Sequence, residues 1–139
     1  MLRLILLAGL LVLAMPPASA AQSTEGHVYT VAWYNAHTGQ EAAYSQGYRE
    51  WLRPVFNELV SQGAIVSYLD LAKNTGSANS THMIIIEYPS WAAVGELTGK
   101  LDAASRSVLG RPFTEVVEQF DQMRDANGNE IYTAPPGGM

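Results

Sequence analysis

Strand-like and helix-like stretches follow one another in a defined order between residues 27 and 134. Residues 27–35 (HVYTVAWYN) are rich in Val, Tyr, Trp and Thr, which favours a β-strand. From Gln40 to Ser61, apolar residues recur every three or four positions, which predicts an amphipathic helix with Gly63 as its C-terminal cap. Pro54 lies inside this helix, and we expect it to kink the preceding turn.

The rest of the chain repeats these two kinds of pattern. Further strands are predicted at residues 64–72 (AIVSYLDLA), 81–88 (THMIIIEY) and 130–133. Further helices are predicted at residues 91–98, 101–109 and from Pro112 to about Arg124. Ser90 is expected to cap the first of these helices, Gly110 to close the second, and Asn127-Gly128 to form a tight turn before the last strand.

The order β-α-β-β-α-β, with extra helical turns before the last strand, predicts an α+β fold of the ferredoxin-like arrangement, an antiparallel sheet with helices on one face. The strands at 27–35 and 81–88 carry apolar residues on both faces, whereas a sheet with one face in water normally alternates. A second copy of the chain is the simplest cover for the other face, which predicts a homodimeric α/β barrel with an interior cavity. The alternative to a dimer is a monomer in which one apolar face of the sheet stays uncovered.

The first 20 residues have the features of a secretory signal. Arg3 precedes a run of 12 mostly aliphatic residues, Pro16-Pro17 interrupts it, and Ala18-Ser19-Ala20 supplies the small residues of a cleavage site. The run is too short for a bilayer, which takes ~20 apolar residues, so no stable membrane anchor is expected. We expect cleavage between Ala20 and Ala21 and a periplasmic or secreted protein. A polar lead-in at 21–26, a domain at 27–134 and a loose tail at 135–139 would follow.

Composition excludes several functional classes. Residues 21–139 contain seven Lys/Arg against 13 Asp/Glu, a net charge of −6, and no basic cluster, so binding to nucleic acid is not expected. The chain has no Cys, which removes disulfides, thiolate metal sites and a Cys nucleophile. No dinucleotide, nucleotide-triphosphate, serine-hydrolase or zinc-protease motif is present.

Three segments resemble the dimeric α/β-barrel superfamily. They are YTVAWYNAHTGQEAAY, WLRPVFNELVSQGAIVSYL and HMIIIEYPSWAAV, and the closing RDANGNEIY resembles the last strand of that fold. Among its branches, the pattern looks most like the NIPSNAP-like and antibiotic-biosynthesis-monooxygenase-like proteins. The resemblance implies a ferredoxin-like dimer but no single activity, because the superfamily contains monooxygenases, isomerases, haem enzymes and members of no known activity.

Three polar residues are weak catalytic candidates. His37 follows the first strand in a loop at the expected barrel mouth, and Asn35 lies just before it. Glu87 lies among Ile and Tyr, where burial would raise the pKa of its carboxyl and suit it to acid–base chemistry. A surface or structural role is the alternative for all three. The three His of the chain have no metal-ligand spacing, so neither a metal nor any other cofactor is expected.

Aromatic residues are the better candidates for ligand binding, because rings that line a cavity stack on planar organic molecules. The candidates are Trp33, Tyr34, Tyr48, Trp51, Tyr68 and Tyr88. Core packing is the alternative for each.

Two functions remain open. The first is a non-enzymatic protein that binds a small hydrophobic or aromatic molecule in its barrel cavity. The second is a cofactor-independent monooxygenase or isomerase acting on an aromatic or polyketide-like substrate. Polar groups that converge on the cavity would favour the enzyme, and a purely apolar lining would favour binding.

Overall fold

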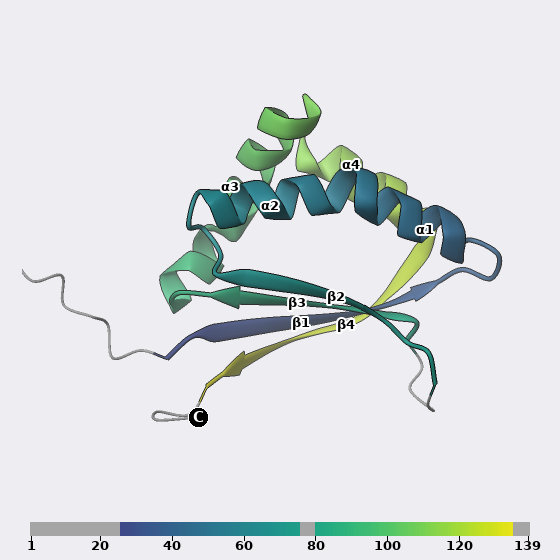
Figure 1. Cartoon of the computed structure of the whole chain (residues 1–139), viewed down its shortest axis with the longest axis horizontal. Helices are drawn as coiled ribbons and strands as arrows, with labels where there is room; N and C mark the ends of the chain where they lie inside the picture. The colour runs from purple at the N-terminus through teal and green to yellow at the C-terminus, as the bar shows by residue number, and fades with distance from the viewer. Residues whose placement is uncertain (1–25, 76–79, 135–139) are drawn as a thin grey trace, which may run out of the picture.

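The computed structural model describes residues 26–75 and 80–134. Four strands form one antiparallel sheet in the order β2-β3-β1-β4. They are β1 (Val28–Ala36), β2 (Ser67–Ala72), β3 (His82–Tyr88) and β4 (Arg124–Thr133). All helices lie on one side of this sheet, as Figure 1 shows. The α+β, ferredoxin-like fold predicted from the sequence is therefore confirmed.

The long first helix contains the irregularity expected from Pro54. α1 (Glu41–Gly47) continues into a π-helical segment (Tyr48–Leu52) and then into α2 (Arg53–Ser61). Pro54 has no N–H to donate to the carbonyl four residues earlier, and its ring crowds that carbonyl. The wider π turn directly before it accommodates both effects.

Gly63 ends this helix in the predicted way. Its φ of 68° is in the left-handed region, which glycine adopts without strain. Its N–H donates to the carbonyl of Val60, and the N–H of Ala64 donates to that of Leu59. These bonds satisfy carbonyls that the helix end would otherwise leave unpaired.

The next helix corrects the sequence prediction. Residues 91–98 and 101–109 were expected to form two helices, but α3 runs without a break from Trp91 to Leu109. Ser90 caps it by accepting a hydrogen bond from the N–H of Ala93, and Gly110 closes it at a φ of 71°, both as predicted. Gly99 costs a helix interior about 1 kcal/mol but does not stop it. The packing of Leu97, Leu101 and Ala104 against the core outweighs that cost.

The last helix and strand also differ from the prediction. α4 spans Phe113–Asp121, and β4 begins at Arg124, where the helix had been expected to end. Asn127-Gly128 is not a tight turn, because β4 passes through it with a register shift opposite Trp33 and Tyr34. β1 is nine residues long, and pairing its whole outer edge takes a strand longer than the four residues predicted.

The core lies between the sheet and the helices. Its largest fully buried side chains are Tyr44, Leu59, Ile65, Tyr88 and Phe120. The opposite face of the sheet has no helix over it (Figure 1). On that face Leu69 is 55% exposed and Leu71 is 42% exposed. The sheet therefore has one covered and one uncovered apolar face.

Several sequence predictions fall outside the described residues. They are the signal segment 1–20, the cleavage point between Ala20 and Ala21, most of the lead-in, and the tail at 135–139. Within the described ranges, none of the helices combines the length and the hydropathy that crossing a bilayer requires.

Candidate functional site

A cavity of about 560 Å³ lies between the sheet and the helices of a single chain. Its floor comes from β1, β3 and β4, and its walls come from the π-helical segment, α2, α3 and α4. Most of the lining is apolar, and it includes Leu52, Phe56, Ile84, Ile86, Val94, Leu97, Leu101, Phe113, Val117 and Ile131. The sequence prediction placed the cavity between two sheets, whereas this one is on the helix side of the sheet.

Arg124, the first residue of β4, is the one Lys or Arg side chain in the lining of this cavity. It is only 7% exposed. Its guanidinium lies 3.6 Å from the centre of the Tyr34 ring and 4.8 Å from that of Phe120. Its Nη1 donates a long hydrogen bond of 3.4 Å to the hydroxyl of Tyr44. Stacking on aromatic faces suits a guanidinium, which is more weakly hydrated than an ammonium group.

The charge of Arg124 has no opposite charge beside it. Among residues 26–75 and 80–134, no carboxylate lies within 4.0 Å of the guanidinium, and its Nε has no hydrogen-bond partner. Removing a charge from water without pairing it is costly, and cation–π contacts offset only part of that cost. The arrangement therefore leaves a positive charge and a free N–H donor beside an apolar cavity.

Neighbouring ionisable groups reflect the same surroundings. Burial raises the pKa of Tyr44 to about 12, although Arg124 acts in the opposite direction. The pKa of His82 is lowered, first by burial and then by Arg124. The imidazole of His82 is therefore neutral at pH 7, packs 4.2 Å from the Tyr44 ring, and has Nδ1 3.0 Å from Thr81 Oγ1. Neither residue supplies a negative charge to Arg124.

The other polar groups of the cavity are few. The hydroxyls of Thr30 and Tyr88 hydrogen-bond to each other at 3.1 Å. Asp121, Asn129 and Thr98 also contribute to the lining. An apolar cavity with a small number of polar groups that fix orientation is typical of a small-molecule site, and the volume is within the usual range of about 300–1,000 Å³.

The six predicted aromatic residues are not brought together. Tyr34 and Tyr88 line the cavity. Tyr48 is buried, its hydroxyl has no hydrogen-bond partner, and burial raises its pKa. Trp51 packs edge-on against Phe120, and Tyr68 donates a hydrogen bond to Asn57.

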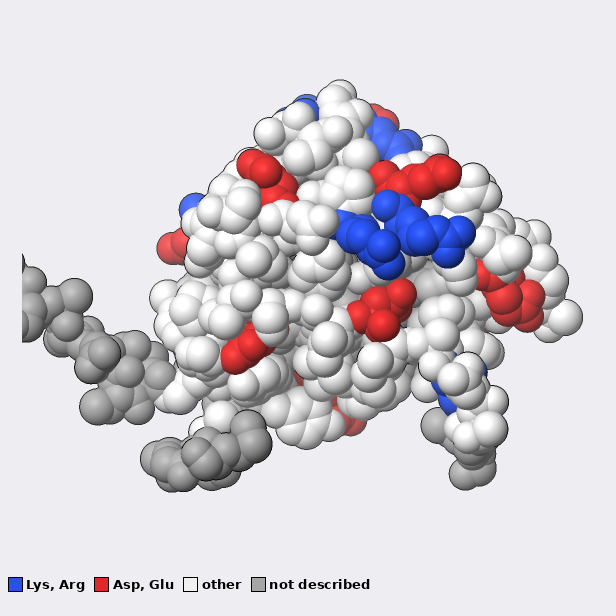
Figure 2. Space-filling model, viewed as in Figure 1, with Lys and Arg blue, Asp and Glu red and all other residues white. Residues whose placement is uncertain are grey.

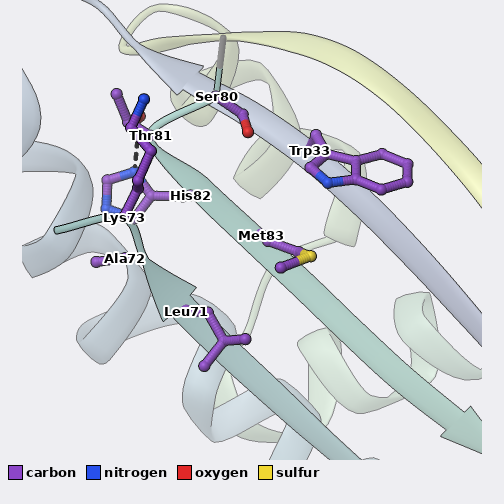
Figure 3. A pocket seen from close by; sticks show the side chains of 8 residues that line it. All are labelled: Trp33, Leu71, Ala72, Lys73, Ser80, Thr81, His82 and Met83. Carbon is purple, nitrogen blue, oxygen red and sulfur yellow. Dashed lines mark hydrogen bonds between the residues drawn. The ribbon is translucent and has the colours of Figure 1, made fainter. Parts of the chain in front are cut away.

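Trp33, the sixth, lies on the uncovered face of the sheet. It is in register with Met83, which is in register with Leu71. Figure 3 shows these three side chains in a row across neighbouring strands. They border a depression of about 220 Å³. The side chains of Trp33 and Tyr34 therefore lie on opposite faces of the sheet.

The three weak catalytic candidates do not converge, and none of them lines the cavity. His37 joins the end of β1 to the start of β4, with Nε2 3.2 Å from Asp125 Oδ1 and Nδ1 3.2 Å from the carbonyl of Gln122. Glu87 lies on the uncovered face, where it accepts hydrogen bonds from Ser67 and Tyr29. These bonds, that from Ser67 first, lower the pKa of its carboxyl, whereas the sequence suggested that burial would raise it. Asn35 pairs with Asp125 in the sheet, also on the uncovered face.

The charged groups outside the cavity bear on two other kinds of site, a metal site and a basic patch. In the described part of the chain, no three His, Asp or Glu side chains are arranged to hold a metal ion. Figure 2 shows a small group of basic side chains over the helices with acidic side chains on both sides of it.

Sequence reasoning missed Arg124 because the predicted helix ended there. A basic residue in the last turn of a helix is ordinary, since it interacts favourably with the helix dipole. Only when β4 is known to begin at this residue does alternation place Arg124 on the covered face. Two signals were available. RDANGNEIY, which begins at Arg124, resembles the last strand of the superfamily fold, and the edge of the long Val28–Ala36 strand needs a partner of similar length.

Comparison with known proteins supports the fold. No protein-family model matches this sequence, and no curated protein is similar to it. Three similar solved structures are SnoaB, a cofactor-independent oxygenase from Streptomyces nogalater, HapK from Hahella chejuensis, and a dimeric ferredoxin-like protein from an uncultured marine organism.

The similarity covers most of each chain at low sequence identity. SnoaB is 14% identical with a TM-score of 0.51, and the match covers 79% of this chain and 94% of SnoaB. For HapK the identity is 12% and the TM-score 0.51, over 81% and 96% of the two chains. For the dimeric protein the identity is 9% and the TM-score 0.52, over 78% and 84%. Identities this low show a shared fold and leave the activity open.

Proposed function

We propose that this protein binds a small planar, largely apolar molecule that carries an acidic oxygen, in the cavity between its sheet and its helices. The observation that carries the proposal is the buried guanidinium of Arg124, which lines the cavity and has no carboxylate beside it. A carboxylate or phenolate of the ligand would supply the missing negative charge. The aliphatic and aromatic lining would hold the rest of the molecule.

Calorimetric titration with 2-naphthoate and with its methyl ester tests this proposal. The acid should bind the wild-type protein more tightly than the ester does. Arg124→Gln should weaken the binding of the acid by roughly tenfold to a hundredfold, which corresponds to the loss of one charged hydrogen bond. The affinity for the ester should not change. Arg111→Gln is the matched control, because Arg111 lies over Trp51 outside the cavity. Equal binding of acid and ester, or no binding of either, would refute the proposal.

A second candidate is a cofactor-independent oxygenase. The fold is shared with the oxygenase SnoaB, and Arg124 would stabilise the enolate or phenolate that such a reaction starts from. An acidic CH₂ beside a ring carbonyl loses a proton, and the carbanion adds to O₂. The peroxide takes up the proton and then loses water, so one O₂ yields one new carbonyl oxygen and one H₂O.

Oxygen uptake with an anthrone separates the two candidates. An oxygenase should raise the rate above spontaneous oxidation, and Arg124→Gln should remove most of the increase while Arg111→Gln keeps it. Binding without acceleration would leave the protein as a binding protein. An isomerase, which the sequence also left open, would change the substrate without consuming O₂.

We also propose that the protein is a homodimer joined through the uncovered face of the sheet. That face carries Trp33, Leu69, Leu71, Met83 and Ile85, with no helix over them (Figure 1). An exposed apolar surface of this kind marks an interface. The similar fold of a dimeric ferredoxin-like protein supports the proposal.

We also propose that the protein is exported from the cytoplasm. Residues 1–20 have the charge, apolar run and small-residue site of a secretory signal, and cleavage between Ala20 and Ala21 would release a chain of residues 21–139. Intact-mass measurement of periplasmic material tests this. A mass that still includes residues 1–20 would contradict it.

A further inference from the structure

A second hollow of about 620 Å³ lies between α3 and α4. It shares four lining residues with the inner cavity, namely Thr98, Leu101, Phe113 and Val117. Each of these four residues therefore borders both spaces. The two hollows are neighbours, and three of the four residues that they share are apolar.

Gly99 of α3 lines the hollow between α3 and α4 and contributes no side chain to it. A Cβ built on Gly99 would have no neighbouring atom within 4 Å. Gly95, one turn earlier on the same helix, also has open space around it but lines neither hollow. A glycine in a helix interior lowers stability relative to alanine, so Gly99 makes α3 less stable than an alanine there would.

The connection between the two helices is fixed by specific hydrogen bonds. The N–H of Phe113 donates to Asp102 Oδ1 at 3.0 Å, and Ser105 Oγ donates to the carbonyl of Arg111 at 2.8 Å. Arg106 Nε donates to Asp102 Oδ2 at 2.8 Å. The α3–α4 turn is therefore held in one geometry, and the hollow is part of the folded structure rather than a gap between loose helices.

The charges of the two hollows differ. The inner cavity is lined by one cation, Arg124, and one carboxylate, Asp121, whereas the outer hollow is lined by two carboxylates, Asp102 and Glu118. An anionic group can therefore pair with Arg124 in the inner cavity, whereas the outer hollow offers it no cation. The outer hollow otherwise presents Leu101, Phe113 and Val117, which suit an uncharged apolar group.

We propose that the outer hollow is a second subsite for the ligand of the inner cavity. The ligand is an elongated acid, with its anionic head at Arg124 and an uncharged apolar tail that passes between α3 and α4 beside Gly99. The subsite sets the length of ligand that the protein prefers. This inference rests on the proposed binding function, because it extends the same molecule from the same site.

A series of 6-alkoxy-2-naphthoates, from methoxy to hexyloxy, tests the subsite by calorimetric titration. In the wild-type protein, each methylene that enters the hollow should tighten binding by about threefold to fourfold. Gly99→Leu places a side chain beside the proposed path of the tail and should abolish this gain for the longer tails. It should leave the affinity for unsubstituted 2-naphthoate unchanged. Gly95→Leu is the matched control and should keep the wild-type dependence on tail length.

Each result decides a different point. If 2-naphthoate binds but the wild-type affinity does not rise with tail length, the subsite is refuted and the inner site stands. The same holds if Gly99→Leu and Gly95→Leu show the same dependence on length. If 2-naphthoate does not bind the wild-type protein, the proposed function fails and the subsite fails with it. The wild-type series needs no variant, so a misfolded variant does not prevent a decision.

Discussion

Two charged side chains on opposite faces of the sheet have opposite surroundings. Arg124, on the covered face, is buried with no carboxylate beside it. Glu87, on the uncovered face, accepts hydrogen bonds from Ser67 Oγ at 2.6 Å and Tyr29 Oη at 3.1 Å, and lies 2.5 Å from His27 Nδ1. The first arrangement leaves a charge for a ligand to neutralise, whereas the second satisfies its charge within the chain.

The network around Glu87 predicts a dependence of stability on pH. The hydrogen bond from Ser67 is the largest cause of its lowered pKa, and those from His27 and Tyr29 add to it. A carboxyl whose folded pKa lies below its unfolded value stabilises the protein above the unfolded pKa, and the contribution is lost as pH falls through the folded pKa. Glu87→Gln should therefore lower Tm near neutral pH, and the difference from wild type should shrink in acid.

Thermal denaturation over a pH series checks this prediction. Glu96→Gln, on the exposed surface of α3, is the control and should change Tm little at any pH. A Glu87→Gln effect that stays constant from neutral pH into acid would show that the carboxylate is not what stabilises the fold.

At the scale of elements, the sequence predicted what local chemistry decides. Ser90, Gly63 and Gly110 end or begin helices as expected, because a cap depends on one side chain or one dihedral angle. The continuity of α3 through Gly99 and the length of β4 depend on packing and pairing with residues far away in the chain. For this reason the cavity and Arg124 could not be located from the sequence, although Tyr34 and Tyr88 were among the predicted ligand-binding residues.

Two glycine substitutions should change stability in opposite directions. Gly63→Ala forces an alanine into a positive φ and should cost about 1–2 kcal/mol in the free energy of unfolding. Gly95→Ala removes an entropic cost inside α3, where the added methyl meets no atom, and should stabilise by about 0.5–1 kcal/mol. Urea denaturation measures both values. Two changes of the same sign would contradict the local conformations described for these glycines.

At the scale of the whole molecule, the helices cover one of the two faces of the sheet (Figure 1). The sequence predicted this imbalance from strands that are apolar on both faces. It predicted an interior cavity between two sheets, which only a dimer would form, and it did not predict the cavity on the helix side, because the helices had to be placed first. That cavity lies within a single chain, so a dimer would have two such sites.

The proposed dimer predicts a selective effect of Leu69→Asp. Light scattering coupled to size exclusion should give the mass of two protomers for wild-type residues 21–139, with an interface on the order of 2,000 Å². Leu69 is 55% exposed in a single chain, so an Asp there should leave the fold intact but break the dimer. Val108→Asp, at an exposed position of α3, is the control and should remain dimeric. A folded wild-type protein with the mass of one protomer would exclude the dimer.

A crystal structure of residues 21–139 with 2-naphthoate bound is the most direct test of the proposed site. The carboxylate should lie ~2.7–2.9 Å from a guanidinium nitrogen of Arg124, in the range of charged hydrogen bonds. The rings should lie between the sheet and the helices, against Tyr34 and Ile84. Naphthoate bound on the uncovered face of the sheet, or in the cavity with its carboxylate directed away from Arg124, would contradict the proposed function.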